Sequence, residues 1–186
     1  SAETTLLKLT SAYCSFVNGG KLIEPKLIDR IQDSEGNTIF KTEIRKCRNC
    51  EDVSILSNDV PEIKDDSKQI FSPQTAYQVT SILEGATKTG TAKKLRDLKM
   101  DLAGKTGTTN KNTDTWFIGF TSDLVIGVYV GYDEPKSLGK FETGAKTAMP
   151  IFKSFIKSAL KKENTRPFKV PENITMMVVD SKTGKK

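Results

Sequence analysis

Hydrophobic side chains recur at helical spacing in three separate parts of the chain. The first part covers residues 4–17, the second begins at Ser72-Pro73, and the third begins near Pro150. Spacing of three and four residues predicts amphipathic helices, with Thr4 or Thr5 capping the first and Ser72 capping the second. The second helix is predicted to bury Ala76, Val79, Ile82, Leu83 and Ala86, and the third Ile151, Phe152, Phe155, Ile156, Ala159 and Leu160.

Three β-rich runs lie between the second and third helices, at residues 100–109, 115–121 and 124–132. Their short connections predict an antiparallel meander. The last two runs are apolar at nearly every position, so both faces of the sheet should be covered. The predicted fold class is therefore α+β, an antiparallel sheet covered by helices.

Two further segments differ in character from this core. Residues 21–66 are predicted to form a small β region with a turn at 33–37, followed by a polar, exposed and mobile excursion over 49–68. The tail, 167–186, contains a strand-like stretch at 174–179 and reads as the start of a truncated extension. Since the chain also begins without Met, we expect a piece of a longer protein.

Composition excludes several kinds of chemistry. The 186 residues contain no histidine, so a Ser-His-Asp triad, a Cys-His dyad and a His-Glu-x-x-His zinc site are all excluded. Proton transfer would then fall to Lys, a carboxylate, Tyr or Cys. The net charge of +6 comes from scattered lysines, and nucleic acid is not an expected partner. No stretch approaches the roughly 20 apolar residues that span a bilayer.

The three cysteines do not predict a metal site. Cys14 falls in an apolar helical pattern and is predicted to be a small buried hydrophobe. Cys47 and Cys50 have redox or half-zinc spacing, but a structural zinc ion takes about four ligands and the chain has no second pair to supply them. We expect Cys47 and Cys50 to form a local disulfide or to remain as two free thiols without a chemical role. No metal or cofactor is predicted.

A Lys-Thr-Gly triplet carries the candidate chemistry. Read as Gly-Lys-Thr it suggests a phosphate-binding loop, but Lys99 occupies the position where that loop needs another glycine, and the triplet leads from strand to strand. Lys-Thr-Gly on a strand is instead a signature of serine acyl-transferases. Of the triplets at 88–90, 105–107 and 182–184, only the middle one lies in a predicted strand, and we assign the others to loops.

An extended strand suits this chemistry because a peptide-like substrate can pair with its edge. Lys105 and Thr106 should point to opposite faces, and Gly107 leaves room for a ligand to approach closely. Thr108 follows the glycine, where its N–H can stabilise a developing oxyanion and its hydroxyl can hold a carboxylate.

The surrounding sequence resembles a known family. Residues 103–110, 114–120 and 127–133, together with 11–20, 82–85 and 90–92, resemble the C-terminal half of the transpeptidase domain of class A, bifunctional penicillin-binding proteins. The resemblance implies that residues 1–166 belong to this domain, that 21–66 is an inserted β region, and that 167–186 begins a truncated C-terminal extension.

The resemblance also implies an activity, peptidoglycan D,D-transpeptidation through a serine acyl-enzyme, with stem peptides and β-lactams as ligands. It assigns catalytic roles to Lys105 and Thr108 and substrate binding to Thr106, Gly107 and Thr109. The implied location is the bacterial cell envelope, on the periplasmic or extracytoplasmic side of the inner membrane, with membrane attachment only through a missing N-terminal part.

The nucleophile of this family does not carry over. Residues 154–157 and 158–161 fit Ser-x-x-Lys, but they lie downstream on the last helix and are predicted to be surface residues. The chain is therefore expected to supply a binding wall without the attacking serine and to be inactive alone. Strands missing from its sheet would leave an exposed edge, which predicts a risk of self-association.

Two alternatives remain open. A β-lactamase or penicillin-sensing relative would share the triplet, but the inserted strands and the run Trp116-Phe117-Ile118-Gly119-Phe120 argue against it. A noncatalytic module would instead bind peptidoglycan or a partner protein through its sheet edge. A Ser-x-x-Lys motif in the parent sequence would distinguish the enzyme from the module.

Overall fold

The structure is a computed structural model that describes residues 3–42, 47–48, 62–63, 65, 67–160, 165–180 and 183–186. The chain divides into two units, Ser1–Ile23 together with Gln69–Lys186, and Glu24–Lys68.

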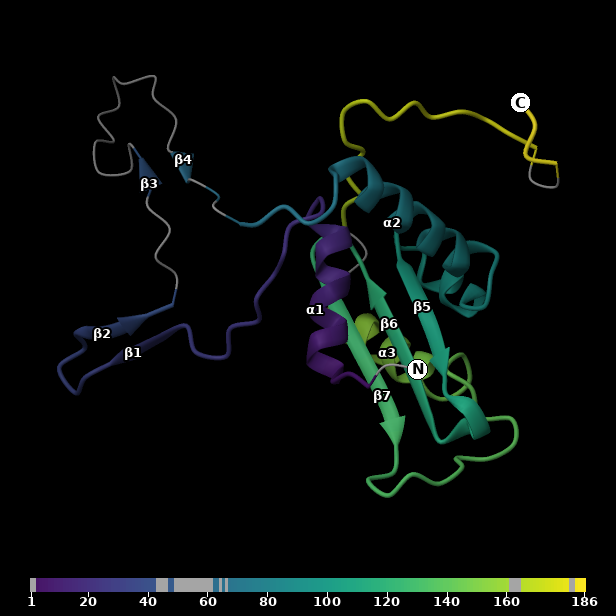
Figure 1. Ribbon diagram of the computed structural model, residues 1–186, viewed down its shortest axis with the longest axis horizontal. Helices are drawn as coiled ribbons and strands as arrows, with labels where there is room; N and C mark the ends of the chain where they lie inside the picture. Colours follow the sequence, from purple (N-terminus) through teal and green to yellow (C-terminus); the bar gives the residue numbers. More distant parts are fainter. Residues whose placement is uncertain are drawn as a thin grey trace. The chain divides into compact units, whose positions relative to one another are not determined.

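An antiparallel sheet of three strands forms the centre of the larger unit (Figure 1). Its strands are β5 (Ala103–Thr108), β6 (Asp114–Phe120) and β7 (Val125–Gly131), in the order β5-β6-β7. Each strand pairs with the next along the chain, and this confirms the predicted meander.

Helices lie against both faces of this sheet (Figure 1). The helices are α1 (Leu6–Val17), α2 (Pro73–Lys88) and α3 (Ala148–Ala159). A side chain on Gly127 would collide with α1, whereas one on Gly119 would collide with Phe152 of α3. These two glycines point to opposite faces of the sheet, so α1 and α3 cover opposite faces. Together with α2, which packs on β5, they confirm the α+β class.

Local signals set the helix starts. The Thr5 hydroxyl accepts the Lys8 N–H at 3.2 Å, and the Ser72 hydroxyl accepts the Thr75 N–H at 3.1 Å. Both predicted caps are confirmed. Helix α3 begins two residues before Pro150, because proline fits the first turn of a helix, where its missing N–H needs no partner.

The main core lies between α3 and the sheet. The rings of Phe117 and Phe152 meet there, with centroids 4.9 Å apart. The buried apolar side chains of this core are Ala92, Leu95, Leu102, Phe117, Ala148, Met149, Phe152 and Ile156.

Four apolar residues predicted to be buried are exposed: Ile82 at 73%, Ile151 at 51%, Phe155 at 52%, and Ala159. The prediction was wrong for α2 because its packed face includes two threonines. The Thr80 hydroxyl donates to the Phe16 carbonyl at 3.3 Å, and the Thr87 hydroxyl donates to the Leu102 carbonyl at 2.5 Å. A buried hydroxyl with a carbonyl partner costs little to bury.

Two short 3₁₀ helices, η1 (Lys93–Leu98) and η2 (Asn110–Asn112), occupy connections next to β5. The strand-like stretch at 174–179 is not a strand, so that prediction was wrong. This part of the tail instead contacts α2, where the Tyr77 hydroxyl lies 3.9 Å from the Met176 sulfur.

The smaller unit contains two short antiparallel pairs, β1 (Arg30–Gln32) with β2 (Thr38–Lys41) and β3 (Cys47–Arg48) with β4 (Glu62–Ile63). The predicted turn at 33–37 is confirmed, since the Asp33 carboxylate accepts the backbone N–H groups of Glu35 and Asn37. The hydrogen bond from the Asn37 side chain lowers the pKa of Asp33 below its ordinary value.

Two predictions for the smaller unit fall on residues that are not described. Most of the excursion over 49–68 lies outside the described residues, and so do Cys50 and the side chain of Cys47. The disulfide and the excursion therefore stay predictions.

Candidate functional site

Strand β5 leaves the protein interior at Lys105. Ala103 and Gly104 are buried, Thr106 and Gly107 are half-buried, and Lys105 and Thr108 are exposed. The Lys-Thr-Gly triplet thus lies where an edge strand passes from the core to the surface.

The backbone of β5 presents polar groups on the side away from β6. The Leu102 carbonyl accepts from Thr87 of α2, and the Thr106 carbonyl accepts from the Lys105 ammonium at 2.7 Å. Because alternate residues of a strand direct their N–H and C=O groups to the same side, the Thr108 N–H faces this side too. Among the described residues, no strand pairs with this edge of β5.

The side chains divide between the two faces of β5 as the alternation requires. Lys105 lies opposite Ile118, whereas Thr106 lies opposite Phe117. The Thr106 hydroxyl is 3.4 Å from the hydroxyl of Thr91, in the connection after α2. This contact brings residues 90–92 next to the triplet.

Gly107 lies close to Trp116 on the neighbouring strand β6. A Cβ added at Gly107 would lie 3.1 Å from the Trp116 Cβ, closer than most natural contacts. The Trp116 indole is held in turn by a 2.6 Å hydrogen bond to the Asp114 carboxylate. The missing side chain of Gly107 therefore leaves room for Trp116 of the neighbouring strand.

Thr108 contacts a residue that sequence reasoning missed. The buried Gly144 donates its backbone N–H to the Thr108 hydroxyl oxygen at 3.1 Å. A Cβ on Gly144 would lie 2.5 Å from the carbonyl oxygens of Gly107 and Trp116, so only glycine fits between the strands and this loop. Thr109, in contrast, bonds within the turn, where its hydroxyl accepts the Asp114 N–H at 3.0 Å.

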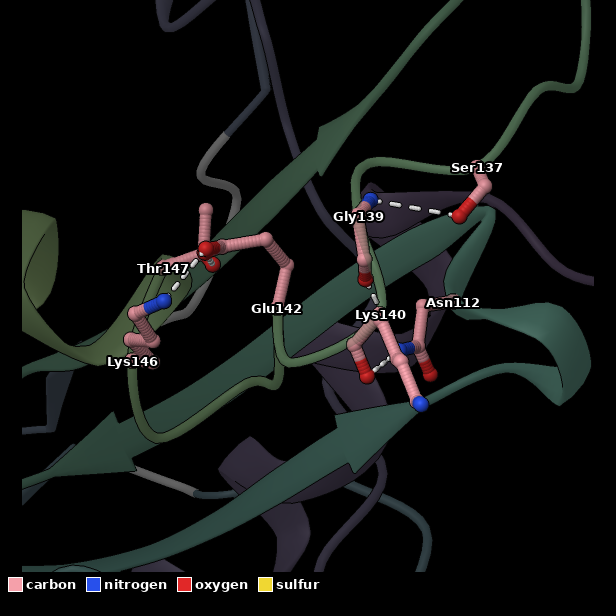
Figure 2. A network of polar contacts seen from close by, with 7 residues as sticks. All are labelled: Asn112, Ser137, Gly139, Lys140, Glu142, Lys146 and Thr147. Atoms are coloured by element: carbon pink, nitrogen blue, oxygen red, sulfur yellow. Dashed lines mark hydrogen bonds and ion pairs between the residues drawn. The ribbon is translucent and has the colours of Figure 1, made fainter.

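The loop that carries Gly144 is tied to the β5–β6 turn (Figure 2). The Asn112 side chain donates to the carbonyls of Gly139 and Lys140, both at 3.0 Å. Farther along, the Glu142 carboxylate accepts from Lys146 at 2.6 Å and from Thr147 at 2.7 Å. The hydrogen bond from Lys146, followed by that from Thr147, lowers the pKa of Glu142.

The other candidate motifs are not part of strand β5. Lys88 and Thr89 end helix α2, where Lys88 pairs with Glu84 at 2.7 Å. Lys182 is outside the described residues. Ser154 and Ser158 are exposed on α3, as the sequence predicted.

A cavity of about 780 Å³ lies near the β6–β7 turn. It is lined by the end of α1, the start of α2 and tail residues 166–173. Thr108 pairs with Thr115 at the other end of β6, so this cavity is separate from the Lys105–Thr108 strand.

An exposed Lys-Thr-Gly edge strand on a helix-covered antiparallel sheet is typical of the penicillin-binding and β-lactamase class of acyl-transferases. The comparison with protein families specifies the class further. Residues 2–157 match the penicillin binding protein transpeptidase domain, and the chain belongs to this family.

The similar proteins agree with this assignment. Penicillin-binding protein 1A of Rickettsia prowazekii is 46% identical over 187 residues, covering 100% of this chain and 24% of that protein. The protein of the same name from Neisseria meningitidis serogroup A is 35% identical, covering 94% of this chain and 20% of that protein. The chain thus spans about a quarter or less of these relatives, and the predicted resemblance to class A penicillin-binding proteins is confirmed.

Solved structures support the same fold. The crystal structure of penicillin-binding protein 1A from Haemophilus influenzae has a TM-score of 0.81 and 32% identity, covering 98% of this chain and 30% of that one. An imipenem acyl-enzyme of penicillin-binding protein A from Mycobacterium tuberculosis has a TM-score of 0.60 and 23% identity, covering 85% of this chain and 32% of that one. At that identity the second structure supports the fold alone.

Among the described residues, none of the helices combines the length and apolar character that crossing a membrane requires.

Proposed function

We propose that the chain supplies one wall of the active site of a longer peptidoglycan D,D-transpeptidase. The observation that carries this proposal is the edge of β5, where Lys105, Thr106 and Thr108 come to the surface on a strand that has no strand partner on this side among the described residues. A stem peptide or a β-lactam would lie along this edge as an added strand.

Each residue of the wall has a role in the proposed acyl transfer. The Thr108 N–H would stabilise the oxyanion of the tetrahedral intermediate, while the Thr106 and Thr108 hydroxyls would bind the substrate carboxylate. The Lys105 ammonium would stabilise negative charge beside the serine and take part in its proton network. Gly107 keeps the strand close to its neighbours, and Thr109 continues the wall into the turn.

The attacking serine would come from a segment outside this chain. Ser154 and Ser158 are exposed on α3, which packs on the opposite face of the sheet from α1. We infer that the chain alone is inactive and that residues 1–166 act within a complete domain, with 21–66 as an insertion and 167–186 as the start of a further segment.

The relatives favour a bacterial cell-envelope enzyme, and we place its active site on the periplasmic side of the inner membrane. The second edge of the sheet, β7, also lacks a strand partner among the described residues. An unpaired edge can pair with a second copy, so we propose that the chain self-associates when made alone.

Intact mass after incubation with penicillin tests the proposal. The full-length parent should gain one penicillin mass, and the 186-residue chain should gain none. An adduct on the short chain would show that it holds a nucleophile of its own. A parent that gains no mass would favour the noncatalytic binding module.

Changing Lys105 to Ala in the parent tests the wall itself. Loss of one charge-stabilising group at such a site typically slows the chemistry by about 10²–10³. The acylation rate should fall by about this factor while the unfolding temperature stays unchanged. Lys157→Ala, an exposed lysine on α3, is the matched control, and equal rates in the two variants would remove Lys105 from the mechanism.

A further inference from the structure

Among the described residues, the Thr108 hydroxyl makes one hydrogen bond, which occupies only part of its hydrogen-bonding capacity. A hydroxyl offers one hydrogen to donate and two lone pairs to accept. The Gly144 N–H takes one lone pair, at 3.1 Å. Because an N–H can only donate, this contact leaves the hydroxyl hydrogen of the exposed Thr108 available to a ligand.

Gly144 is held in place on both sides of its own peptide. Its N–H reaches Thr108, and its carbonyl accepts the Met149 N–H at the start of α3 at 2.8 Å. It also lies against the backbone of Gly107 and Trp116, in a space that a Cβ would fill. The N–H therefore has little freedom to turn away from Thr108.

Asn112 anchors the other part of this loop, 139–147. Its side chain donates to two loop carbonyls, and its own carbonyl accepts the Leu138 N–H at 2.8 Å. Asn112 adopts a left-handed backbone with φ of 54°, a conformation that asparagine tolerates better than most residues. This geometry turns its amide toward the loop.

We propose that loop 139–147, anchored by Asn112, is a positioning device that fixes the Thr108 hydroxyl as a hydrogen-bond donor toward the substrate carboxylate. The Gly144 N–H acts as the contact between loop and hydroxyl. Asn112 and Gly144 are positioning residues because they reach the substrate only through Thr108. The inference rests on the proposed transpeptidase function. It explains how the enzyme would prefer substrates that carry a carboxylate.

The test uses the full-length parent and two ligands, penicillin and its methyl ester. Thr108→Val removes the hydroxyl and keeps the shape of the side chain. A hydrogen bond to a charged group is worth about tenfold or more in rate. Thr108→Val should therefore slow acylation by penicillin about tenfold and leave acylation by the ester, which lacks the carboxylate, nearly unchanged.

Asn112→Gly then tests the loop. Glycine accepts the left-handed backbone and adds no charge, so only the amide anchor is lost. The variant should lower the acid-to-ester rate ratio severalfold, and it should add nothing further in a Thr108→Val background. Asn173→Gly, with φ of 63° in the exposed tail, is the matched control and should leave the ratio unchanged.

Several outcomes would overturn the proposal. Thr108→Val with an unchanged acid-to-ester ratio would remove the hydroxyl from carboxylate binding, whatever Asn112→Gly does to folding. Asn112→Gly could instead slow acylation by both ligands equally, or lower the acid-to-ester rate ratio by the same factor with and without Thr108→Val. Either result would show that the loop is only a structural support. A wild-type parent that is not acylated at all would overturn the proposed function itself, and this inference with it.

Discussion

The contact between Gly119 and Phe152 offers a sharp test of how α3 packs on the sheet. A Cβ added at Gly119 would lie 2.5 and 2.6 Å from two ring carbons of Phe152 and 2.7 Å from a ring carbon of Phe117. Gly119→Ala should therefore overpack the core and lower the free energy of unfolding by about 1–3 kcal/mol. Phe152 is fully buried, so Phe152→Ala should cost about 3–5 kcal/mol.

Combining two substitutions separates this contact from general loss of stability. Phe152→Leu removes ring atoms from the place where the new methyl group must fit. The double variant Gly119→Ala/Phe152→Leu should be more stable than the sum of its single variants predicts, by about 1 kcal/mol.

Urea unfolding of the 186-residue chain, followed by circular dichroism, measures these free energies. Phe155→Ala is the control on the same helix, because Phe155 is 52% exposed and should cost much less than Phe152. Strictly additive double-variant values, or equal losses at 152 and 155, would refute the packing described for α3.

Three further predictions concern a cap, a carboxylate and a thiol. Ser72→Ala removes the acceptor of the Thr75 N–H and should lower the free energy of unfolding by about 1 kcal/mol in the same urea assay. The pKa of Glu142 is lowered from 4.5, so its contribution to stability is present above pH 4.5 and is lost as the pH falls through the lowered value. Glu142→Gln should therefore weaken the fall in melting temperature over this acidic range, as measured in a pH series. Burial raises the pKa of Cys14, so iodoacetamide should label it about tenfold more slowly in the folded chain than in urea, as followed by peptide mass spectrometry.

Each of these three has a simple control. Ser81→Ala changes an exposed serine within the same helix and should leave stability unchanged or slightly higher, so an equal loss at both serines would contradict the cap. Glu134→Gln removes an equal charge from the segment before loop 139–147, and matching acid profiles for the two variants would contradict the role of Glu142. Equal labelling of Cys14 in the folded and unfolded chain would show an open thiol.

The sequence predicted the elements well where the signals are local. The hydroxyls of Thr5 and Ser72 cap helices within three residues of themselves, and the runs of β6 and β7 are apolar enough to identify both strands. Helical periodicity also grouped residues by face, but it does not say which faces become covered. Ile82 and Phe155 are exposed for this reason, while the buried Thr80 depends on a carbonyl 64 residues away.

The candidate site divides in the same way. Lys105 to Thr108 could be predicted because their spacing and strand context are contiguous. Gly144 and Asn112 could not, since their bonds join residues 36 and 27 positions apart, respectively. Asparagine is common in turns, so the sequence does not show that Asn112 has a left-handed backbone or that its side chain contacts a distant loop. Such contacts become visible only when the chain is folded.

The packing of α1 against β7 has a consequence for the time course of biosynthesis. Helix α1 is the first element of this segment to leave the ribosome, yet it packs on a strand that follows roughly 100 residues later. At about 5–20 residues per second, α1 waits about 5–20 s for its partner. During this interval α2 can already pack on α1, but the part of α1 that meets β7 stays uncovered, and slower translation between α1 and β7 would lengthen the exposure.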